Sequence, residues 1–182
     1  ADLSDADFGD ATLTGATLVS TIMTGADFSD TSLTNASLQG ADMTNAIFKK
    51  ARLTGANLTE ADMPAADLQS ADLVNATLSQ VNCTGALFTG ATMINAVLDG
   101  AVMIGVTMTN ANLTAADLSG ADLTGAKLSN ADLTQAVLED TNLSGATMSS
   151  AQLTGTIWEN TTCPDGTKSS DHGDTCINNL VP

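Results

Sequence analysis

The sequence has few of the side chains from which most catalytic sites are built. It contains one histidine, His172, together with three cysteines and no tyrosine. With this single histidine, neither a Ser-His-Asp set nor a Cys-His set can be assembled within the regular part of the chain. The histidine and the cysteines also do not complete a zinc ligand set. We therefore expect a protein that is not an enzyme and that binds no cofactor and no metal.

Long apolar runs and basic residues are scarce as well. No stretch approaches the eighteen or so apolar residues of a membrane span, and no basic segment followed by an apolar one opens the chain as in a signal peptide. Five basic residues face 21 acidic ones, which gives a net charge of −16 at pH 7. Such a charge repels nucleic acid and anionic lipid. We expect no nucleic acid partner and no membrane span.

What the chain does contain is an unbroken repeat of five residues. Every fifth residue from Leu3 to Trp158 is Leu, Met or Phe, apart from Cys83 and Trp158 itself, and the repeat reads Ala-Asp/Asn-Leu-Ser/Thr-Gly/Asn. A period of five would spiral around an α-helix and would alternate between the faces of a strand. The chain must therefore turn once per repeat. Ala and Leu then point inward, and Gly or Asn occupies corners that need positive φ.

The phenylalanines indicate how many sides the coil has. All four are separated by multiples of twenty residues and so form one core column: Phe8, Phe28, Phe48 and Phe88. Twenty residues at five per side make a four-sided coil, whereas a three-sided coil would scatter this column. We expect about eight parallel coils over residues 1–160, a solenoid roughly 38 Å tall. Where Thr replaces the inward Ala, its hydroxyl must find a carbonyl partner.

This repeat resembles that of the pentapeptide-repeat family, and the resemblance covers about residues 1–160. It implies an all-β fold, a right-handed four-sided parallel β-helix, and the hand agrees with the general preference of parallel crossings. The motif is specific for the fold and says little about function.

A segment of different composition follows at residues 161–182, and we predict that it caps the solenoid. Cys163 and Cys176 could close a loop there as a disulfide that stabilises the fold by about 3 kcal/mol; two free thiols or half of a metal site are the alternatives. Cytosolic disulfides are uncommon. The Cys-Pro-Asp-Gly-Thr sequence from Cys163 resembles the ending of extracytoplasmic pentapeptide-repeat proteins of cyanobacteria. That resemblance implies a location in the thylakoid lumen or periplasm. Cys83, at a core position, should be a buried and inert thiol.

Departures from the polar exterior mark the candidate interaction surface. Outward apolar residues gather in the middle of the chain, and we define them as the mid-rod patch: Val74, Ile94, Val97, Val102 and Ile104. The one basic cluster, Lys49, Lys50 and Arg52, could form salt bridges or dock an acidic partner. The outward aspartates should keep ordinary pKa values, because water surrounds them on a convex rod.

These features favour a non-enzymatic structural or protein-interaction scaffold with an unknown protein partner, either a monomer or a weak dimer through a solenoid end. One alternative is an acidic DNA mimic that binds gyrase, a type II topoisomerase, as some members of the family do; the expected disulfide argues against a cytosolic partner. A third alternative is ice binding by an outward column of threonines. That column is interrupted by Val74 and Ile94, and its members are Thr14, Thr34, Thr54, Thr114, Thr134 and Thr154.

Overall fold

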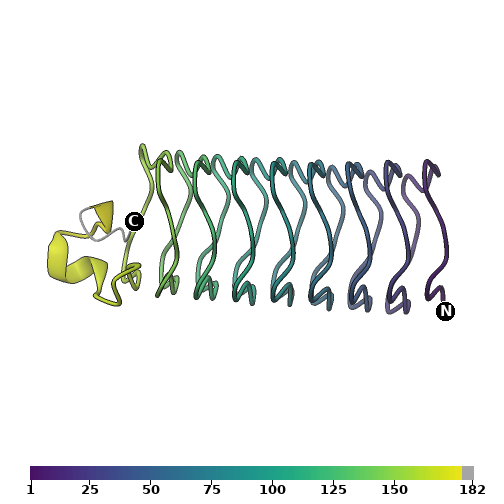
Figure 1. The fold of residues 1–182 in the computed structure, drawn as a ribbon, viewed down its shortest axis with the longest axis horizontal. Helices are drawn as coiled ribbons and strands as arrows, with labels where there is room; N and C mark the ends of the chain where they lie inside the picture. Colours follow the sequence, from purple (N-terminus) through teal and green to yellow (C-terminus); the bar gives the residue numbers. More distant parts are fainter. Residues whose placement is uncertain (178–182) are drawn as a thin grey trace.

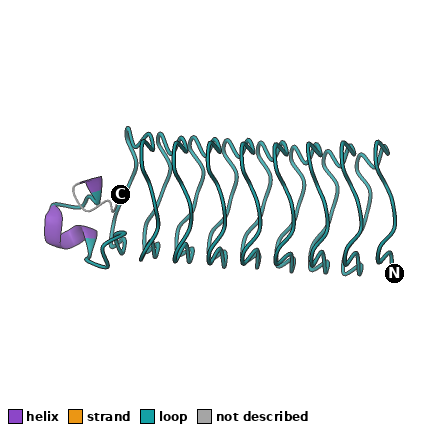
Figure 2. Ribbon diagram, viewed as in Figure 1, coloured by secondary structure: helices purple, strands orange, loops and turns teal. Residues whose placement is uncertain are grey.

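The chain forms a rod of stacked coils that ends in a small C-terminal cap (Figure 1). This computed structural model describes residues 1–177. Within them, the one named element is the 3₁₀ helix η1, Ser169–His172, in the cap (Figure 2). The coils are built from isolated parallel β-bridges, because two of every five residues lie in turns and only three remain extended. The predicted parallel coil is therefore present without long strands.

Each parallel bridge joins residues that are twenty positions apart. The series starts with Asp2 and Ile22 and continues to Asn142 and Thr162, with one bridge for every five residues. Backbone hydrogen bonds hold the register: Leu3 N donates to Ile22 O at 2.7 Å, and Ile22 N donates to Ala1 O at 2.9 Å. The coil therefore has four sides, as the phenylalanine spacing predicts.

A tight turn forms every corner. In the first one, Ala6 N donates to Leu3 O at 3.1 Å, and the residue before the Ala has positive φ. A turn of four residues with positive φ only at its third residue is a type II turn. Gly15 and Asn35 fit this position as expected, with φ of 69° and 56°. Lys50 and Ala65 adopt it too, although a Cβ atom makes this conformation costly.

The outward Asp or Asn of many repeats braces the turn that follows it. Asp42 Oδ1 accepts hydrogen bonds from Thr44 N at 3.0 Å and from Thr44 Oγ1 at 2.7 Å. Asn57 accepts the same two bonds from Thr59. This geometry explains why the repeat pairs Asp or Asn with Ser or Thr two residues later: the side chain supplies an acceptor for a backbone N–H that the coil leaves unpaired.

These hydrogen bonds change the acidity of some aspartates. Donation from the Ser or Thr hydroxyl, and then from its backbone N–H, lowers the pKa below the ordinary value of 3.8 in Asp2, Asp27 and Asp42. The expectation that the outward aspartates keep ordinary pKa values is therefore wrong for these three. Water does reach them, but the neighbouring donors stabilise the charged form.

The inward side chains fill the tube in four columns. Phe28 stacks on Phe8 on one side and on Phe48 on the other, each pair with ring centroids 4.9 Å apart. Phe28, Phe48 and Phe88 are fully buried, whereas Phe8 in the first coil is only partly buried. Ala96, like most of the inward alanines, has no exposed surface.

The inward threonines Thr31, Thr141 and Thr156 donate to backbone carbonyls, as expected. Thr31 Oγ1 donates to Phe8 O at 2.6 Å, and Thr141 Oγ1 donates to Leu118 O at 2.7 Å. In both cases the acceptor belongs to the preceding coil. A polar group inside the tube thus becomes a link between coils, because a buried hydroxyl without a partner would be costly.

The cap is tied to the last coil by backbone, side-chain and covalent links. Thr162 still bridges Asn142 in parallel, and it also bridges Lys168 in antiparallel fashion. The fully buried Ser169, at the start of η1, donates its hydroxyl to Trp158 O. Cys163 and Cys176 form the predicted disulfide, with their Cα atoms 5.3 Å apart.

The close packing around Ala96 predicts a large effect of overfilling. Ala96→Phe should lower the free energy of unfolding by about 3 kcal/mol or more, because the tube has no room for a ring beside the column residues. Thr92→Phe, at an outward position, should change it by less than about 1 kcal/mol. Urea unfolding would measure both. Equal stabilities of the two variants would contradict the assignment of Ala96 to the interior.

The corner at Ala65 predicts a stabilising substitution. Ala65→Gly should raise the free energy of unfolding by about 1 kcal/mol, because Gly adopts the φ of 56° without steric cost. Gly85→Ala, at the equivalent corner one coil later, is the matched control. Its added Cβ would meet no heavy atom within 4 Å, so it should lower stability by a similar amount through φ alone. Shifts of the same sign in thermal unfolding would contradict this account.

The lowered aspartate pKa values predict a loss of stability in acid. Because the folded-state pKa lies below 3.8, the stabilisation is present above about pH 4 and is lost as the pH falls through the folded-state value. A variant with Asp27→Asn and Asp42→Asn keeps the acceptors, so its urea midpoint should fall less between about pH 7 and pH 3. The control variant with Asp10→Asn and Asp30→Asn removes the same charge from corners. If the two variants respond identically, the hydrogen bonds are not the cause.

Candidate interaction surface

The mid-rod patch lies around the edge between two sides of the rod. Val97 belongs to one side, where it bridges Thr77 and Asp117, and Val102 belongs to the next side, where it bridges Asn82 and Asp122. The side chains of Val102 and Ile104 are 38% and 40% exposed, whereas the other three patch residues, Val74, Ile94 and Val97, are partly buried. The five residues are therefore spread over these two adjacent sides and their outer corners, with Val102 and Ile104 the most accessible.

Sequence reasoning missed several apolar residues that are more exposed than this patch. Val19 and Ile22 are 44% and 45% exposed in the first two coils, and Ile157 is 50% exposed in the last one. In the cap, Ile177 is 53% exposed. The first three occupy outward positions of the repeat, so the rule that selects Val74 would also have found them. Ile177 lies outside the repeat and carries no such signal.

The basic cluster is partly neutralised within the rod. Lys49 Nζ lies 3.1 Å from Asp67 Oδ2, and half of the Lys49 side chain is exposed. Lys50 occupies a corner with φ of 55°, and Arg52 bridges Ser32 and Asp72 on a side. Exposed ion pairs of this kind contribute little to stability. The expectation of salt bridging at this cluster is confirmed for Lys49.

The threonine column does not form a uniform array of hydroxyls. Thr54 Oγ1 donates to Asp72 Oδ2 at 3.0 Å, and Thr114 Oγ1 donates to Asn112 Oδ1 at 2.6 Å. These hydroxyls therefore point toward different neighbours in different coils. A column whose donors are already engaged with acidic and amide side chains is a poor template for ordered water.

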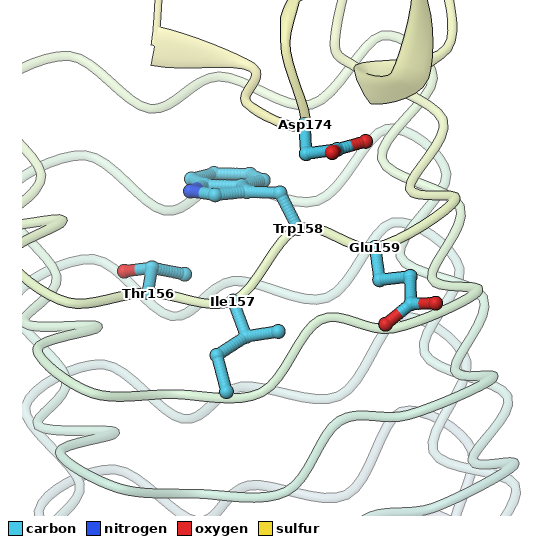
Figure 3. A pocket seen from close by; sticks show the side chains of 5 residues that line it. All are labelled: Thr156, Ile157, Trp158, Glu159 and Asp174. Atoms are coloured by element: carbon cyan, nitrogen blue, oxygen red, sulfur yellow. The ribbon is translucent and has the colours of Figure 1, made fainter.

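A pocket of about 400 Å³ lies where the cap meets the last coil, and we name it the cap pocket. Figure 3 shows Asp174, from the cap, above the Trp158 indole, with Ile157 on the coil below it. Thr156 and Glu159 complete the lining. The Trp158 side chain is only 3% exposed, while Glu159 and Asp174 are exposed. The pocket thus combines a buried aromatic ring with two carboxylates.

Cys83 is buried in the core of the rod, and His172 lies in the cap. Burial raises the pKa of the Cys83 thiol to about 12, so it does not provide a thiolate at neutral pH. His172 is the last residue of η1 in the cap. Among residues 1–177, no three His, Cys, Asp or Glu side chains are grouped so that they could hold a metal ion. In the same range no helix is long and apolar enough to cross a membrane.

Comparison with known proteins gives a consistent family assignment. A family described as pentapeptide repeats matches the chain with eight copies, over residues 1–40, 13–49, 26–63, 46–82, 82–120 and 121–157. A search of curated proteins finds no match.

Several solved structures are similar to this chain. A trypsin-treated variant of QnrB1, a plasmid-mediated fluoroquinolone resistance protein, is 18% identical with a TM-score of 0.68, and the match covers 88% of this chain and 78% of QnrB1. HetL, a pentapeptide repeat protein involved in heterocyst differentiation regulation in the cyanobacterium Nostoc, is 27% identical over 92% of this chain and 91% of HetL, with a TM-score of 0.44.

A pentapeptide repeat protein from the Arabidopsis thaliana thylakoid lumen is 35% identical over 66% of each chain, with a TM-score of 0.20. The likeness to QnrB1 concerns the fold alone, whereas the family match rests on the repeat and extends from residue 1 to residue 157. The twenty-residue register, the four type II turns per coil and these eight matched copies together show that the chain belongs to the pentapeptide-repeat family, with its right-handed four-sided β-helix.

Proposed function

We propose that this protein is a non-enzymatic scaffold whose exterior binds another protein, with a solenoid of about eight coils over residues 1–160 and a capping segment over residues 161–182. The observation that supports this most is the mid-rod patch on a rod whose core is closed. Its side chains Val102 and Ile104 are exposed, although Met103 between them is fully buried in the core. Solenoids commonly bind partners on such repeating faces.

The disulfide supports a location outside the cytosol. Cys163 and Cys176 are bonded in the described part of the cap, and cytosolic proteins rarely keep such bonds. We infer a periplasmic or thylakoid-lumen location in a cyanobacterium, which agrees with the resemblance of the tail. The protein acts there as a monomer, or as a weak dimer through a solenoid end.

A DNA-mimicking role is the second candidate, and the charge of −16 favours it. An acidic rod could occupy the DNA-binding surface of a type II topoisomerase such as gyrase. The two candidates differ in compartment, since gyrase is cytosolic and the scaffold is proposed to be exported. Fractionation of the source cells therefore distinguishes them.

The scaffold proposal predicts that the mid-rod patch carries the partner. A tagged protein with Ile94→Ser, Val97→Ser and Ile104→Ser should lose at least about tenfold of partner capture after crosslinking in the extracytoplasmic fraction, because the apolar contact area is removed. Its unfolding free energy should change by less than about 1 kcal/mol, since Ile104 in particular is well exposed.

The matched control carries Val19→Ser and Ile22→Ser, which remove exposed aliphatic side chains near the other end of the rod. This variant should capture the same protein as the unchanged rod, identified by mass spectrometry. Undiminished capture by the patch variant would refute the assignment of the patch. Recovery of gyrase from the cytosolic fraction would refute the scaffold proposal in favour of the DNA mimic.

A further inference from the structure

One side of the rod departs from the repeat at two positions at once. In three repeats, and in no others between Leu3 and Trp158, an acidic residue directly follows the inward core residue: Asp99, Glu139 and Glu159. In the same three repeats an aliphatic residue directly precedes the core residue: Val97, Val137 and Ile157. Parallel bridges join these aliphatic residues in series through Asp117, so all three repeats lie on one side of the rod. We name the six residues the acid-aliphatic side.

The two columns of this side lie next to each other. In the coil between Val97 and Val137 the regular repeat is kept: Asp117 Oδ1 accepts hydrogen bonds from Ser119 N at 3.0 Å and from Ser119 Oγ at 2.6 Å. The side chain before the core residue therefore reaches the side chain after it. An aliphatic side chain offers no acceptor to the turn, so these three repeats give up this stabilising contact. Their residues do not serve the turn.

Two carboxylates of this side are available to a partner. Glu139 and Glu159 are exposed, and neither side-chain carboxylate takes part in a hydrogen bond or ion pair described for residues 1–177. Asp99 differs from them, because it is partly buried and accepts the hydroxyl proton of Ser79 in a hydrogen bond between coils. The two glutamates are therefore the groups that can pair with an external cation.

The rod supplies little positive charge to this side. The ion pair described for residues 1–177 joins Lys49 to Asp67, on another side of the rod. Lys168 of the cap approaches the neighbouring corner, where its Nζ donates to Asn160 O at 2.9 Å. The field of a protein with a net charge of −16 adds to that of the glutamates. A cationic partner is therefore attracted, and an anionic one is repelled.

The aliphatic column supplies apolar surface beside these carboxylates. Ile157 is 50% exposed, and Val97 and Val137 are partly buried. Figure 3 shows the side chains of Ile157 and Glu159 pointing away from the Trp158 indole. They therefore belong to the outside of the coil, as the alternation along an extended segment requires. An apolar strip bordered by negative charge fits a partner surface on which an apolar strip is bordered by positive charge.

The spacing of the column selects the conformation of that partner. Coils follow one another at about 4.8 Å, so the column from Val97 to Ile157 is roughly 14 Å long. An α-helix that lies along the rod presents one turn every 5.4 Å or so, and it drifts by only about 2 Å from the coils over this length. In an extended strand, residues on one face recur about every 6.7 Å, and the drift reaches about 6 Å. The column therefore favours a helix.

We propose that the acid-aliphatic side binds a cationic amphipathic α-helix of a partner protein, laid along the rod. The aliphatic stripe of the helix packs on Val97, Val137 and Ile157, and lysine or arginine side chains beside that stripe pair with Glu139 and Glu159. Long cationic side chains suit this place, because their stems pack on apolar surface while their heads stay charged. The inference rests on the proposed function, in that the helix belongs to a protein partner, and it adds the chemistry of that partner.

A designed peptide tests this side directly. The peptide acetyl-AKLAAKLAKLAAKLA-amide places its leucines on one helical face with a lysine directly before each, and a helix of this length is marginal in water on its own. The rod has no α-helix among residues 1–177, so a gain of helical circular dichroism during a titration reports the peptide. We expect saturable binding with a Kd on the order of 0.1 mM, weakened by added salt.

A second peptide tests the conformation of the partner. Replacement of the central alanine by proline keeps the charge and the leucines but breaks the helix. This peptide should bind at least about tenfold more weakly. Equal binding of the two peptides would show that the side binds an extended basic segment, and it would overturn the proposal of a helix.

A variant that restores the regular repeat separates binding from folding. On the same side, Asn57 accepts hydrogen bonds from the backbone N–H and the hydroxyl of Thr59. Four substitutions copy this pair into the last two repeats of the side: Val137→Asn, Glu139→Thr, Ile157→Asn and Glu159→Thr. The variant should unfold at an unchanged or higher temperature, because its turns regain an acceptor. It should bind the helical peptide at least about tenfold more weakly, because both the aliphatic surface and the two carboxylates are lost.

A control variant tests for the general field of the rod. Asp10→Asn with Asp30→Asn removes the same number of charges from exposed corners far from the acid-aliphatic side. It should change the Kd of the helical peptide by less than about twofold. Equal weakening in both variants would show that only the overall charge attracts the peptide.

The peptide titration is independent of the mid-rod patch. A variant with Ile94→Ser and Ile104→Ser leaves the acid-aliphatic side intact and should bind the peptide as the unchanged rod does. Undiminished binding by the repeat-restoring variant would overturn the proposal. Absence of peptide binding together with capture of a partner through the mid-rod patch would refute the acid-aliphatic side and leave the scaffold intact. Loss of that capture with retained peptide binding would refute the patch instead.

Discussion

Hydrogen bonding between backbones twenty residues apart is the constraint on which the rest of the structure depends. Because Asp2 bridges Ile22 and every later repeat follows the same rule, each side chain has a fixed place above its counterpart in the previous coil. The narrow interior then admits only one large and one small side chain per side. The turn chemistry follows from the same rule, since a side of three extended residues must be followed at once by a corner. Composition, core and corners are thus consequences of one register.

Much of this architecture could be predicted from the sequence because the repeat is local and regular. The spacing of the phenylalanines predicts the number of sides. The inward threonines predict hydrogen bonds to backbone carbonyls, because a buried hydroxyl needs an acceptor. The role of the outward Asp and Asn was missed, although the recurring Ser or Thr two residues later was a visible signal for the bond between Asp42 and Thr44. Lys50 and Ala65 adopt positive φ at corners although residues with a Cβ atom disfavour it, so the coil register outweighs the conformational preference of the single residue. The cap pocket could not be predicted, because Asp174 reaches Trp158 through tertiary folding outside any period.

The surface divides into regions of different physical character. Along the sides, Asp and Asn side chains accept hydrogen bonds from Ser and Thr hydroxyls and from backbone N–H groups of the turns. Many of the outward polar side chains therefore stabilise the fold. The mid-rod patch departs from this by exposing aliphatic groups such as Ile104, and the cap pocket departs from it by combining Trp158 with two exposed carboxylates. The stacked coils between the two regions fix the distance that separates them.

Because each coil has four sides, the number of repeats between two residues also sets the angle between them about the long axis of the rod. Insertion of one repeat of five residues between Ile104 and Trp158 would preserve the pattern of inward and outward positions, yet it would turn everything beyond it by a quarter of a revolution about the long axis. Insertion of four repeats would restore the orientation and add only one coil spacing, about 4.8 Å, to the length. Relatives that differ by single repeats therefore present their two ends in different directions, whereas those that differ by whole coils differ only in reach.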